Sequence, residues 1–457
     1  MPLTPARQVA YGILRRVETG RAFAVDLLQG PEVMRLKELD RKLAMEISMG
    51  VLRWRGELDF QIERLSGKPL EYFDAEIATI LRMGVYQIKF LEKIPKSAAV
   101  NEAVEGTKAA KKRSAAGLVN AVLRKCQPAK PRLAAKSLKT TDPQHLEAVR
   151  RSFPAWLLER WESTFGKDSA NSLALASISV PRPTLRVAAG ERERIQRELA
   201  SEGFPAELGR YADSALHASS GNICASRPVS EGRAAIQDEA SQLVAQLLAP
   251  RAGERVLDLC AAPGIKTSQL GAMLGAGSLV ACDLSTRRLR TLAILTAGKI
   301  PPDVRMVLLR LDAARDLPFA VKFDRVLVDA PCSGTGTLAR NPEIKWRLRE
   351  NDLARLAELQ QKILRNALKT LAPGGRLVYS TCSLEPEENE QVVECALAGA
   401  GGFRLRAANE LASEFPHLSS LFDSHGYFRT RPDMHAMDGF FAAVITREQD
   451  SSAALAA

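Results

Sequence analysis

The sequence predicts an all-α domain first, then a small α+β subdomain, and then a doubly wound α/β domain. Three observations support this order. Over the first part of the chain, apolar residues recur at three- and four-residue steps, which is the pattern of amphipathic helices. Later, short apolar runs alternate with longer helical patterns, as in α/β domains. The 457 residues, 46% of them hydrophobic, exceed one ordinary domain and can fill several cores.

The all-α domain is expected to span residues 1–130. Thr4 followed by Pro5 is typical of a helix start, since proline suits the first helical position. A linker is predicted at Gln127-Pro128-Ala129-Lys130-Pro131, where the helical pattern stops. The apolar positions at helical spacing are Val9, Ala10, Ile13, Leu14, Val17, Phe73, Ile77, Ile80 and Leu81.

The small subdomain is expected to span residues 141–235. Helices resume from about His145, with Trp156, Leu157, Trp161 and Phe165 as expected core residues. The chain becomes extended at Pro181–Val187, and the role of this region stays open.

The α/β domain is expected to span residues 236–449. Its helical patterns connect strands that should be parallel, so their carboxyl ends should share one edge, where ligands of such sheets bind. The last strand is expected to be an antiparallel edge strand. The predicted strands are Arg255–Leu259, Leu279–Asp283, Val304–Leu309, Phe323–Val328, Gly375–Tyr379 and Asp438–Thr446.

Positive charge is concentrated in the first domain. Residues 1–140 carry 26 Lys and Arg against 15 Asp and Glu, which accounts for the whole net charge of +11. The run Lys111-Lys112-Arg113 lies in the most basic part. Such clustering favours a polyanionic partner, most simply nucleic acid, although a solvated basic helix face and linker would give the same composition.

Composition argues against several other classes of protein. Seven scattered cysteines do not form a disulfide framework, and without a Cys-x-x-Cys pair a structural zinc site is not expected. No apolar run reaches membrane-spanning length, and the first residues lack the apolar core of a signal peptide. We therefore expect a cytoplasmic protein without membrane or metal partners, and we expect it to be a monomer.

Two cysteines follow the ends of two predicted neighbouring strands. Cys332 lies in Asp329-Ala330-Pro331-Cys332-Ser333-Gly334, and Cys382 lies in Ser380-Thr381-Cys382-Ser383. Free cysteines more often act as small buried hydrophobes, but these two lie in loops at a sheet edge. Two thiols and the Asp329 carboxylate should therefore meet where a substrate can bind.

A loop rich in small residues, Cys260-Ala261-Ala262-Pro263-Gly264-Ile265-Lys266, follows the first strand and opens a helix. Small residues let the backbone approach a ligand, and N–H groups at a helix start can receive an anionic group. Asp283 ends the next strand, where a carboxylate can bind a ribose diol or cap the following helix.

Taken together, these motifs resemble those of RNA cytosine-C5 methyltransferases. The first domain resembles the NusB-like RNA-binding domain in five pieces that occur in the same order. With both parts, the chain resembles the Sun/Fmu (RsmB-like) family, which modifies bacterial 16S ribosomal RNA. The five pieces are Asp40–Ala44, Gly50–Trp54, Leu81–Gln87, Ala98–Val104 and Leu118–Arg124.

The resemblance implies a Rossmann-like class I fold and S-adenosylmethionine as the cofactor. By position, Cys382 would be the nucleophile, Cys332 would assist later steps, and Asp329 would contact the target base at the methyl-donor edge. The loop would hold the cofactor, Asp283 its ribose hydroxyls, and Asp312 the region near adenine. The implied cofactor-binding residues are Cys260, Ala261, Ala262, Pro263, Gly264, Ile265, Lys266, Asp283, Asp312 and Asp329.

One position departs from the family pattern, because Gly264 is followed by Ile265 and not by a second glycine. A β-branched residue disfavours positive φ, so we expect ordinary backbone geometry at Ile265.

The chemistry explains why thiols are needed. Cytosine C5 is a poor nucleophile, and addition of a thiolate at C6 makes it enamine-like. The base must also leave its stack, and the basic segment Arg340–Arg347 with its Trp346 is a candidate contact for displaced RNA or, equally, a solvated helix start with Trp346 in the core. Arg429 and Arg431 are weaker candidates for phosphate contacts.

Other functions stay open on sequence alone. The same chemistry on transfer RNA is the second alternative, which the motifs do not exclude. The helical first domain would also suit a non-catalytic RNA-binding or antitermination factor, in which both cysteines would only pack.

Overall fold

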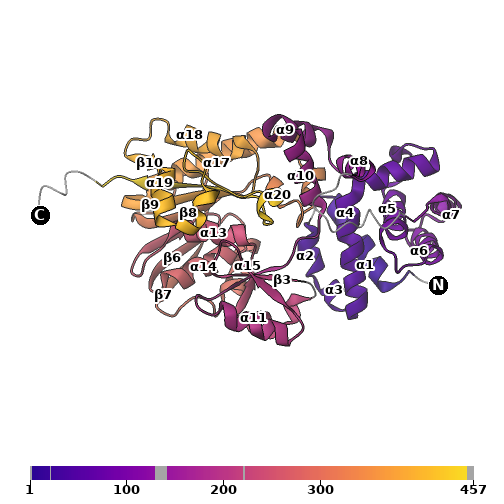
Figure 1. Ribbon diagram of the computed structural model, residues 1–457, viewed down its shortest axis with the longest axis horizontal. Helices are drawn as coiled ribbons and strands as arrows, with labels where there is room; N and C mark the ends of the chain where they lie inside the picture. The colour runs from indigo at the N-terminus through magenta and orange to yellow at the C-terminus, as the bar shows by residue number, and fades with distance from the viewer. Residues whose placement is uncertain (1–2, 21, 129–141, 220–221, 450–457) are drawn as a thin grey trace, which may run out of the picture. The chain divides into compact units, whose positions relative to one another are not determined.

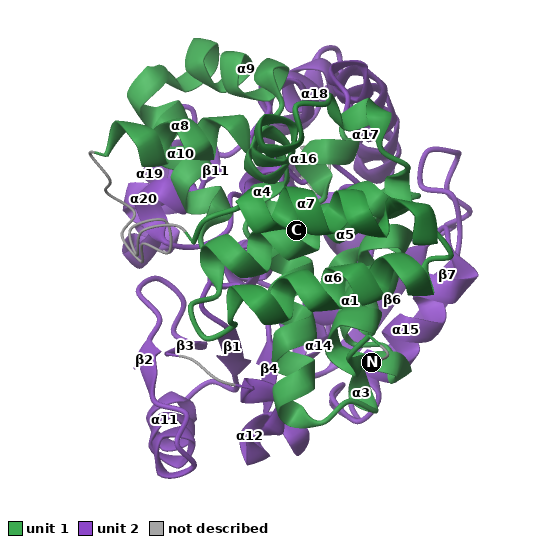
Figure 2. Ribbon diagram, turned by 90° about the vertical axis from the view of Figure 1, so that its right-hand side faces the viewer, with its two compact units in different colours: residues 1–180, 337–348 green, residues 181–336, 349–457 purple. Residues whose placement is uncertain are grey.

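The computed structural model describes residues 3–20, 22–128, 142–219 and 222–449, so most of the expected linker and the tail after Gln449 lie outside them. The chain forms two compact units (Figure 2). Unit 1 comprises Met1–Val180 and Thr337–Leu348, and unit 2 comprises Pro181–Gly336 and Arg349–Ala457. Each unit is therefore discontinuous in sequence.

Unit 1 is helical, as predicted. Its first helix begins at Pro5 with Thr4 as N-cap residue, although the Thr4 hydroxyl bonds Glu102 and not the helix backbone. No helix in the described ranges is long and apolar enough to cross a membrane. The first seven helices are α1 (Pro5–Glu18), α2 (Ala24–Leu28), α3 (Pro31–Met34), α4 (Glu38–Ser66), α5 (Ala75–Phe90), α6 (Lys96–Ala109) and α7 (Ala116–Lys125).

The expected subdomain of residues 141–235 is split between the two units. Helices α8 (Pro143–Arg151), α9 (Ala155–Phe165) and α10 (Lys167–Ile178) belong to unit 1. Arg151 of α8 donates to Glu57 of α4 at 2.7 Å, and the rings of His145 and Trp54 lie 5.9 Å apart. These long-range contacts cannot be read from local periodicity, which explains the difference.

The segment Thr337–Leu348 belongs to unit 1 although it follows the Cys332 motif (Figure 2). It contains the short helix α16 (Ile344–Arg347). Lys345 is fully buried and donates to the Arg53 carbonyl at 2.9 Å, and the Trp346 indole donates to the Leu52 carbonyl at 3.0 Å. Of the two alternatives for this segment, RNA contact or a helix start with Trp346 in the core, the packing of Lys345 and Trp346 favours the second.

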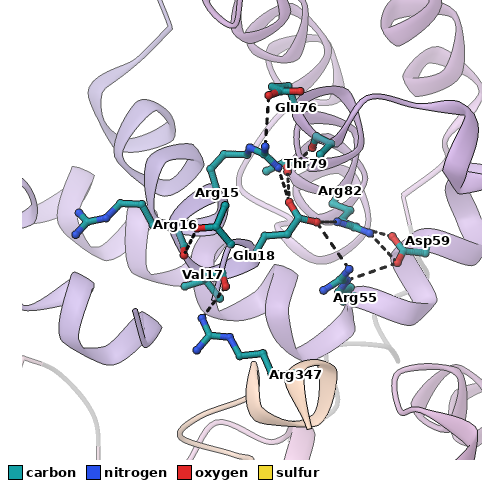
Figure 3. Close-up of polar contacts among 12 residues, drawn as sticks. Arg15, Arg16, Val17, Glu18, Arg55, Asp59, Glu76, Thr79, Arg82 and Arg347 are labelled. Carbon is teal, nitrogen blue, oxygen red and sulfur yellow. Dashed lines mark hydrogen bonds and ion pairs between the residues drawn. The ribbon is translucent and has the colours of Figure 1, made fainter. Parts of the chain in front are cut away.

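Arg347 extends this packing to α1. Its guanidinium donates to the Val17 carbonyl at 2.6 Å, next to a cluster of ion pairs around Glu18 (Figure 3). Glu18 accepts from Arg82 at 3.0 Å, and Arg82 in turn binds Asp59. Arg82 is the buried member of this cluster, and its charge is tolerated because both carboxylates pair with it.

Unit 2 contains a mixed β-sheet with strand order β10-β12-β9-β8-β5-β6-β7, to which β11 (Phe428–Arg429) adds beside β12. The five strands β5 to β9 are parallel, as predicted, and β12 is antiparallel to β9. The strands are β5 (Arg255–Asp258), β6 (Gly277–Asp283), β7 (Val304–Arg310), β8 (Phe323–Asp329), β9 (Leu371–Thr381), β10 (Phe403–Leu405) and β12 (Phe441–Arg447).

The prediction that the last strand lies at the sheet edge is wrong. Strand β10 pairs with β12 on the side away from β9, so β12 is internal. Three residues, Phe403–Leu405, give too short a pattern to predict a strand from sequence.

Helices cover both faces of this sheet (Figure 1), and side chains alternate between two cores. Leu327 of β8 packs with α13 and α14, whereas Val326 and Val328 pack with α17 and α18. The period of two along a strand produces this alternation. The helices are α13 (Glu239–Leu248), α14 (Ile265–Leu274), α15 (Thr286–Thr296), α17 (Glu350–Thr370), α18 (Glu390–Leu397), α19 (Ala408–Glu414) and α20 (Pro432–His435).

A second, antiparallel sheet of order β2-β3-β1-β4 completes unit 2. Arg186 of β1 donates to Gln237 at 2.7 Å and to Ser268 of α14 at 2.8 Å, which fixes this sheet beside the helix that follows the small-residue loop. Its elements are β1 (Thr184–Val187), α11 (Arg192–Ser201), β2 (Ala206–Leu208), β3 (Ala215–Ala218), α12 (Arg227–Ser230) and β4 (Ala234–Ile236).

Candidate active site

The carboxyl ends of the parallel strands bring the predicted residues to one edge of the large sheet. Asp258, Asp283 and Asp329 end β5, β6 and β8, and Cys382 follows β9. Strand order reverses between β5 and β8, and open α/β sheets bind ligands at such a point. The predicted location of the site is therefore consistent with the fold.

The two thiols lie in contact. The sulfurs of Cys332 and Cys382 are 3.2 Å apart, and the Cys382 backbone N–H donates to the Cys332 sulfur at 3.3 Å. The contact with Cys382 and burial raise the pKa of Cys332 well above that of an ordinary thiol. Cys332 is thus held as a protonated thiol beside Cys382.

The Asp329 carboxylate, at the end of β8, is held by two donors. Lys266 donates to Oδ2 at 2.8 Å, and Ser380 donates to Oδ1 at 2.9 Å. Burial lowers the pKa of Lys266, but Asp329 outweighs that effect and the net shift is upward. Lys266, which also lies over the Phe440 ring, is therefore an ammonium at neutral pH.

The small-residue loop leads into α14, which begins at Ile265. Gly264 has φ of +106°, and a Cβ there would lie 2.8 Å from Leu292 Cγ, so only glycine fits. The expectation of ordinary backbone geometry at Ile265 is confirmed, because Ile265 is helical. No side chain caps this helix start, which leaves its N–H groups suited to an anionic group.

Three further carboxylates lie along the β5–β7 half of the edge. Asp283 is almost completely buried, and its Oδ1 accepts from the Ser285 N–H at 2.9 Å. Asp312 lies just beyond β7, where its Oδ1 accepts from the Ala314 N–H at 3.0 Å. Among the described residues, no group of three or more His, Cys, Asp or Glu could hold a metal ion.

Asp258, the third of these carboxylates, was not singled out from the sequence. Its Oδ2 accepts from Thr267 at 2.8 Å, and its buried Oδ1 has no hydrogen-bond partner among the described residues. Burial raises the pKa of Asp258 to about 7, with a further upward contribution from Asp329. Its position at the end of a strand, just before the small-residue loop, is the sequence signal that identifies Asp258.

Glu388 was also missed. It is fully buried and accepts hydrogen bonds from Ser333 and Ser383, the residues that follow the two cysteines. Three acidic residues occur in Glu385-Pro386-Glu387-Glu388, and sequence alone does not show which one faces the site. Arg429 and Arg431 are ion-paired, Arg429 with Asp423 and Glu390, and Arg431 with Asp433, which weakens the case for their phosphate contacts.

Comparison with known proteins identifies the class of enzyme that this arrangement defines. The family model "16S rRNA methyltransferase RsmB/F" matches residues 245–446, and the NusB family model matches residues 4–128. The chain is 32% identical over 448 residues to "Probable ribosomal RNA small subunit methyltransferase B" of Bacillus subtilis, covering 96% of this chain and 98% of the relative. It is 33% identical over 449 residues to "Ribosomal RNA small subunit methyltransferase B" of Pseudomonas putida, covering the same shares.

A solved structure agrees over the same length. The crystal structure of PH0851 superposes with a TM-score of 0.77 at 25% identity, covering 97% of this chain and 99% of that chain. The chain is therefore a methyltransferase dependent on S-adenosylmethionine, with a NusB domain and a Rossmann-like catalytic domain. It belongs to the RsmB/F family of ribosomal RNA methyltransferases.

Proposed function

We propose that this enzyme methylates C5 of a cytosine in 16S ribosomal RNA through a covalent bond between Cys382 and C6 of the base. The observation that carries this proposal is the 3.2 Å contact between the Cys332 and Cys382 sulfurs at the ends of two adjacent parallel strands. A pair of thiols is not needed for methylation at an exocyclic nitrogen, whereas C5 methylation requires nucleophilic addition first.

The residues of the β5–β6–β7 edge fit S-adenosylmethionine. We assign the cofactor to the loop Cys260–Lys266, with Asp283 on its ribose hydroxyls, Asp312 near its adenine and Asp329 at the methyl-donor edge. The start of α14 after Gly264 carries no side-chain cap, so its N–H groups suit the cofactor's carboxylate. When bound, the cofactor supplies an electrophilic methyl group.

Cys382 and Cys332 are assigned to the bond changes on the base. The Cys382 thiolate bonds to C6, and the electron pair of the C5–C6 double bond makes C5 nucleophilic. After C5 has gained the methyl group, a base removes the C5 proton and the C6–sulfur bond breaks, which restores the double bond and the thiolate. We assign assistance in this release to Cys332.

We assign to Asp329 a role during the addition. A carboxylate can hydrogen-bond the N3 or N4 position of the base and stabilise the charge that develops there. The Lys266 ammonium at 2.8 Å and the Ser380 hydroxyl at 2.9 Å hold Asp329 in a fixed orientation, so this help costs little reorganisation.

The substrate proposal rests on the relatives, several of which are named for small-subunit ribosomal RNA. Unit 1 would bind that RNA, supported by its NusB match and its positive charge. Both thiols, Asp329 and the cofactor loop lie in unit 2 of one chain, so we propose that a monomer acts, in the cytoplasm where ribosomal RNA is made.

The test is a denaturing-gel assay for covalent protein–RNA adducts, with 16S rRNA and tRNA transcripts and S-adenosylmethionine. Cys332→Ala should accumulate an adduct that the double variant with Cys382→Ala loses. An adduct that survives in Cys382→Ala and disappears in Cys332→Ala would reverse the two roles. Methyl transfer to tRNA alone would overturn the substrate assignment, and no transfer to either RNA would favour a binding factor.

A further inference from the structure

We propose that Glu388 is a positioning residue that sets the separation of the two thiols by bridging the loops that carry them. This inference rests on the proposed two-cysteine chemistry. The hydrogen bonds of the Glu388 carboxylate run to Ser333, Ser383 and Gln360, so it acts on the sulfurs through the residues beside them.

One carboxylate oxygen fixes the Cys332 loop. Oε1 of Glu388 accepts from the Ser333 backbone N–H at 2.8 Å and from the Gln360 side chain at 2.9 Å. Gln360 also donates to the Pro331 carbonyl at 2.9 Å. The residues before and after Cys332 are thus both tied to the same buried pair of side chains.

The other carboxylate oxygen connects the two loops. Oε2 of Glu388 accepts from the hydroxyls of both Ser333 and Ser383, the latter at 2.5 Å, and the two hydroxyl oxygens are 3.0 Å apart. Ser333 follows Cys332 and Ser383 follows Cys382, so the same Cys-Ser order occurs in both loops. One oxygen atom therefore holds equivalent points of the two loops together.

The backbone around Glu388 is itself anchored to β9. The Tyr379 hydroxyl donates to the Glu388 carbonyl at 2.6 Å. The neighbouring Asn389 accepts from Thr381 at 2.5 Å and donates to the Ser383 carbonyl at 3.0 Å. Rigid support of this kind makes the carboxylate a fixed reference point and not a mobile surface group.

The Glu388 carboxylate matches the donors that surround it. Burying a carboxylate is costly unless it is hydrogen-bonded, and an apolar side chain here would leave the Ser333 N–H and the two serine hydroxyls without this acceptor. The four hydrogen bonds of Glu388 satisfy the group, and three of them end on a residue next to a thiol. The Glu388 carboxylate also lies near Cys332. It helps to raise the pKa of Cys332, to which the contact with Cys382 and burial contribute more.

The first experiment measures thiol separation without methyl transfer. Diamide oxidises two adjacent thiols to a disulfide and takes up their two hydrogens, and mass spectrometry of the peptides gives the rate of Cys332–Cys382 cross-linking. Glu388→Ala should slow this rate at least about tenfold, because the loops lose their bridge. Glu388→Gln should stay within about threefold, since its amide can still bond both serines. Glu394→Gln, an exposed control on α18, should match the parent.

The second experiment measures kinetics on the RNA substrate. Glu388→Ala should lower kcat by about 30-fold or more with both KM values within about threefold, because loss of alignment acts on the chemical step. Glu388→Gln should restore most of kcat. If Glu388→Ala does not fold, the double variant Ser333→Ala with Ser383→Ala removes the same hydroxyl bonds with little loss of volume and should show the same two effects.

The two results separate the proposals. A cross-linking rate and a kcat within twofold of the parent in Glu388→Ala, or in the double serine variant, would overturn the role of Glu388. A slowed cross-link in an enzyme whose parent forms no 5-methylcytosine would instead support the role of Glu388 in holding the loops and overturn the proposed function.

Discussion

Two pairs of thiols in unit 2 differ in their surroundings and not in their residue type. Cys260 and Cys282 adjoin the β5–β6 half of the site, where they pack against the apolar core and burial raises their pKa. Cys332 and Cys382 lie at the β8–β9 half, where they contact each other and are framed by serines and a carboxylate. Polar support around the sulfurs, and not residue type, therefore distinguishes the second pair from the first.

Removing one thiol from each pair should produce the largest difference between the two halves of the site. Cys382→Ala should lower methyl transfer by at least about 10³-fold with little change in Tm, because the proposed nucleophile is lost from a polar loop. Cys282→Ala should keep activity within about threefold but lower stability by about 1 kcal/mol, because Cys282 is fully buried in the core. Activity assays and thermal denaturation of both variants test this. Equal activity losses would erase the distinction.

The second prediction compares two aspartates of one strand. Asp329→Asn should lower kcat by about 10²–10³-fold, because the charge proposed to lie beside the base is lost and only one acceptor oxygen is left for the two donors Lys266 and Ser380. Asp324→Asn, at the opposite end of β8, should leave kcat within about twofold, since an amide oxygen can still accept from Arg255. Steady-state kinetics on the same RNA decides the matter. A strong loss in Asp324→Asn would mean that any charge change on β8 impairs the enzyme.

The third prediction concerns pH and the β5–β6 half. The pKa of Asp258 is raised to about 7 in the folded chain, above its ordinary value near 4, so its stabilising contribution is complete below pH 4 and is lost as pH rises through 7. Asp258→Asn, which carries no charge, should therefore raise Tm on the order of 5 °C at pH 8. The difference should vanish near pH 4. Thermal melts across this range provide the measurement, and a pH-independent difference would contradict the assigned cause.

The smallest expected effect lies in unit 1. Lys111→Gln with Arg113→Gln should weaken RNA binding by less than about tenfold and reduce the salt slope by about 1.4, roughly 0.7 for each phosphate that is no longer neutralised. The matched control is Arg305→Gln with Lys362→Gln, two exposed basic residues of unit 2. Binding titrations between low and high salt distinguish them. An identical slope in the two double variants would show that unit 1 has no special share in RNA binding.

The parallel strands and the helical region were predictable because each carries a strong local period. The apolar run of β8 and the repeated steps of α1 and α5 fix secondary structure without any knowledge of tertiary contacts. The meeting of Cys332 with Cys382 also followed, since parallel strands joined by a helix end at one edge. Assignment of roles to these residues depended on the family resemblance and stays a proposal.

What the sequence did not reveal depends on contacts far apart in the chain. Glu388 and Glu387 are neighbours of the same type, and only the fold buries Glu388 against two serines. Lys345 looks like a surface cation in Arg340–Arg347, yet it is buried over the Phe153 ring. In sequence, Asp258 looks like any other aspartate at a strand end, and only its burial in the fold raises its pKa. In each case burial decides the role, and burial is a property of the folded chain.

The position of Thr337–Leu348 in the sequence, far after the rest of unit 1, also affects synthesis on the ribosome. Unit 1 needs this segment to cover Arg53, Leu52 and Val17, yet roughly 160 residues are translated between Val180 and Thr337. At about 5–20 residues per second, the N-terminal helices wait on the order of ten to thirty seconds for their last piece. The nascent N-terminal helices therefore emerge before the segment that covers them. That segment is synthesised directly after the loop that carries Cys332.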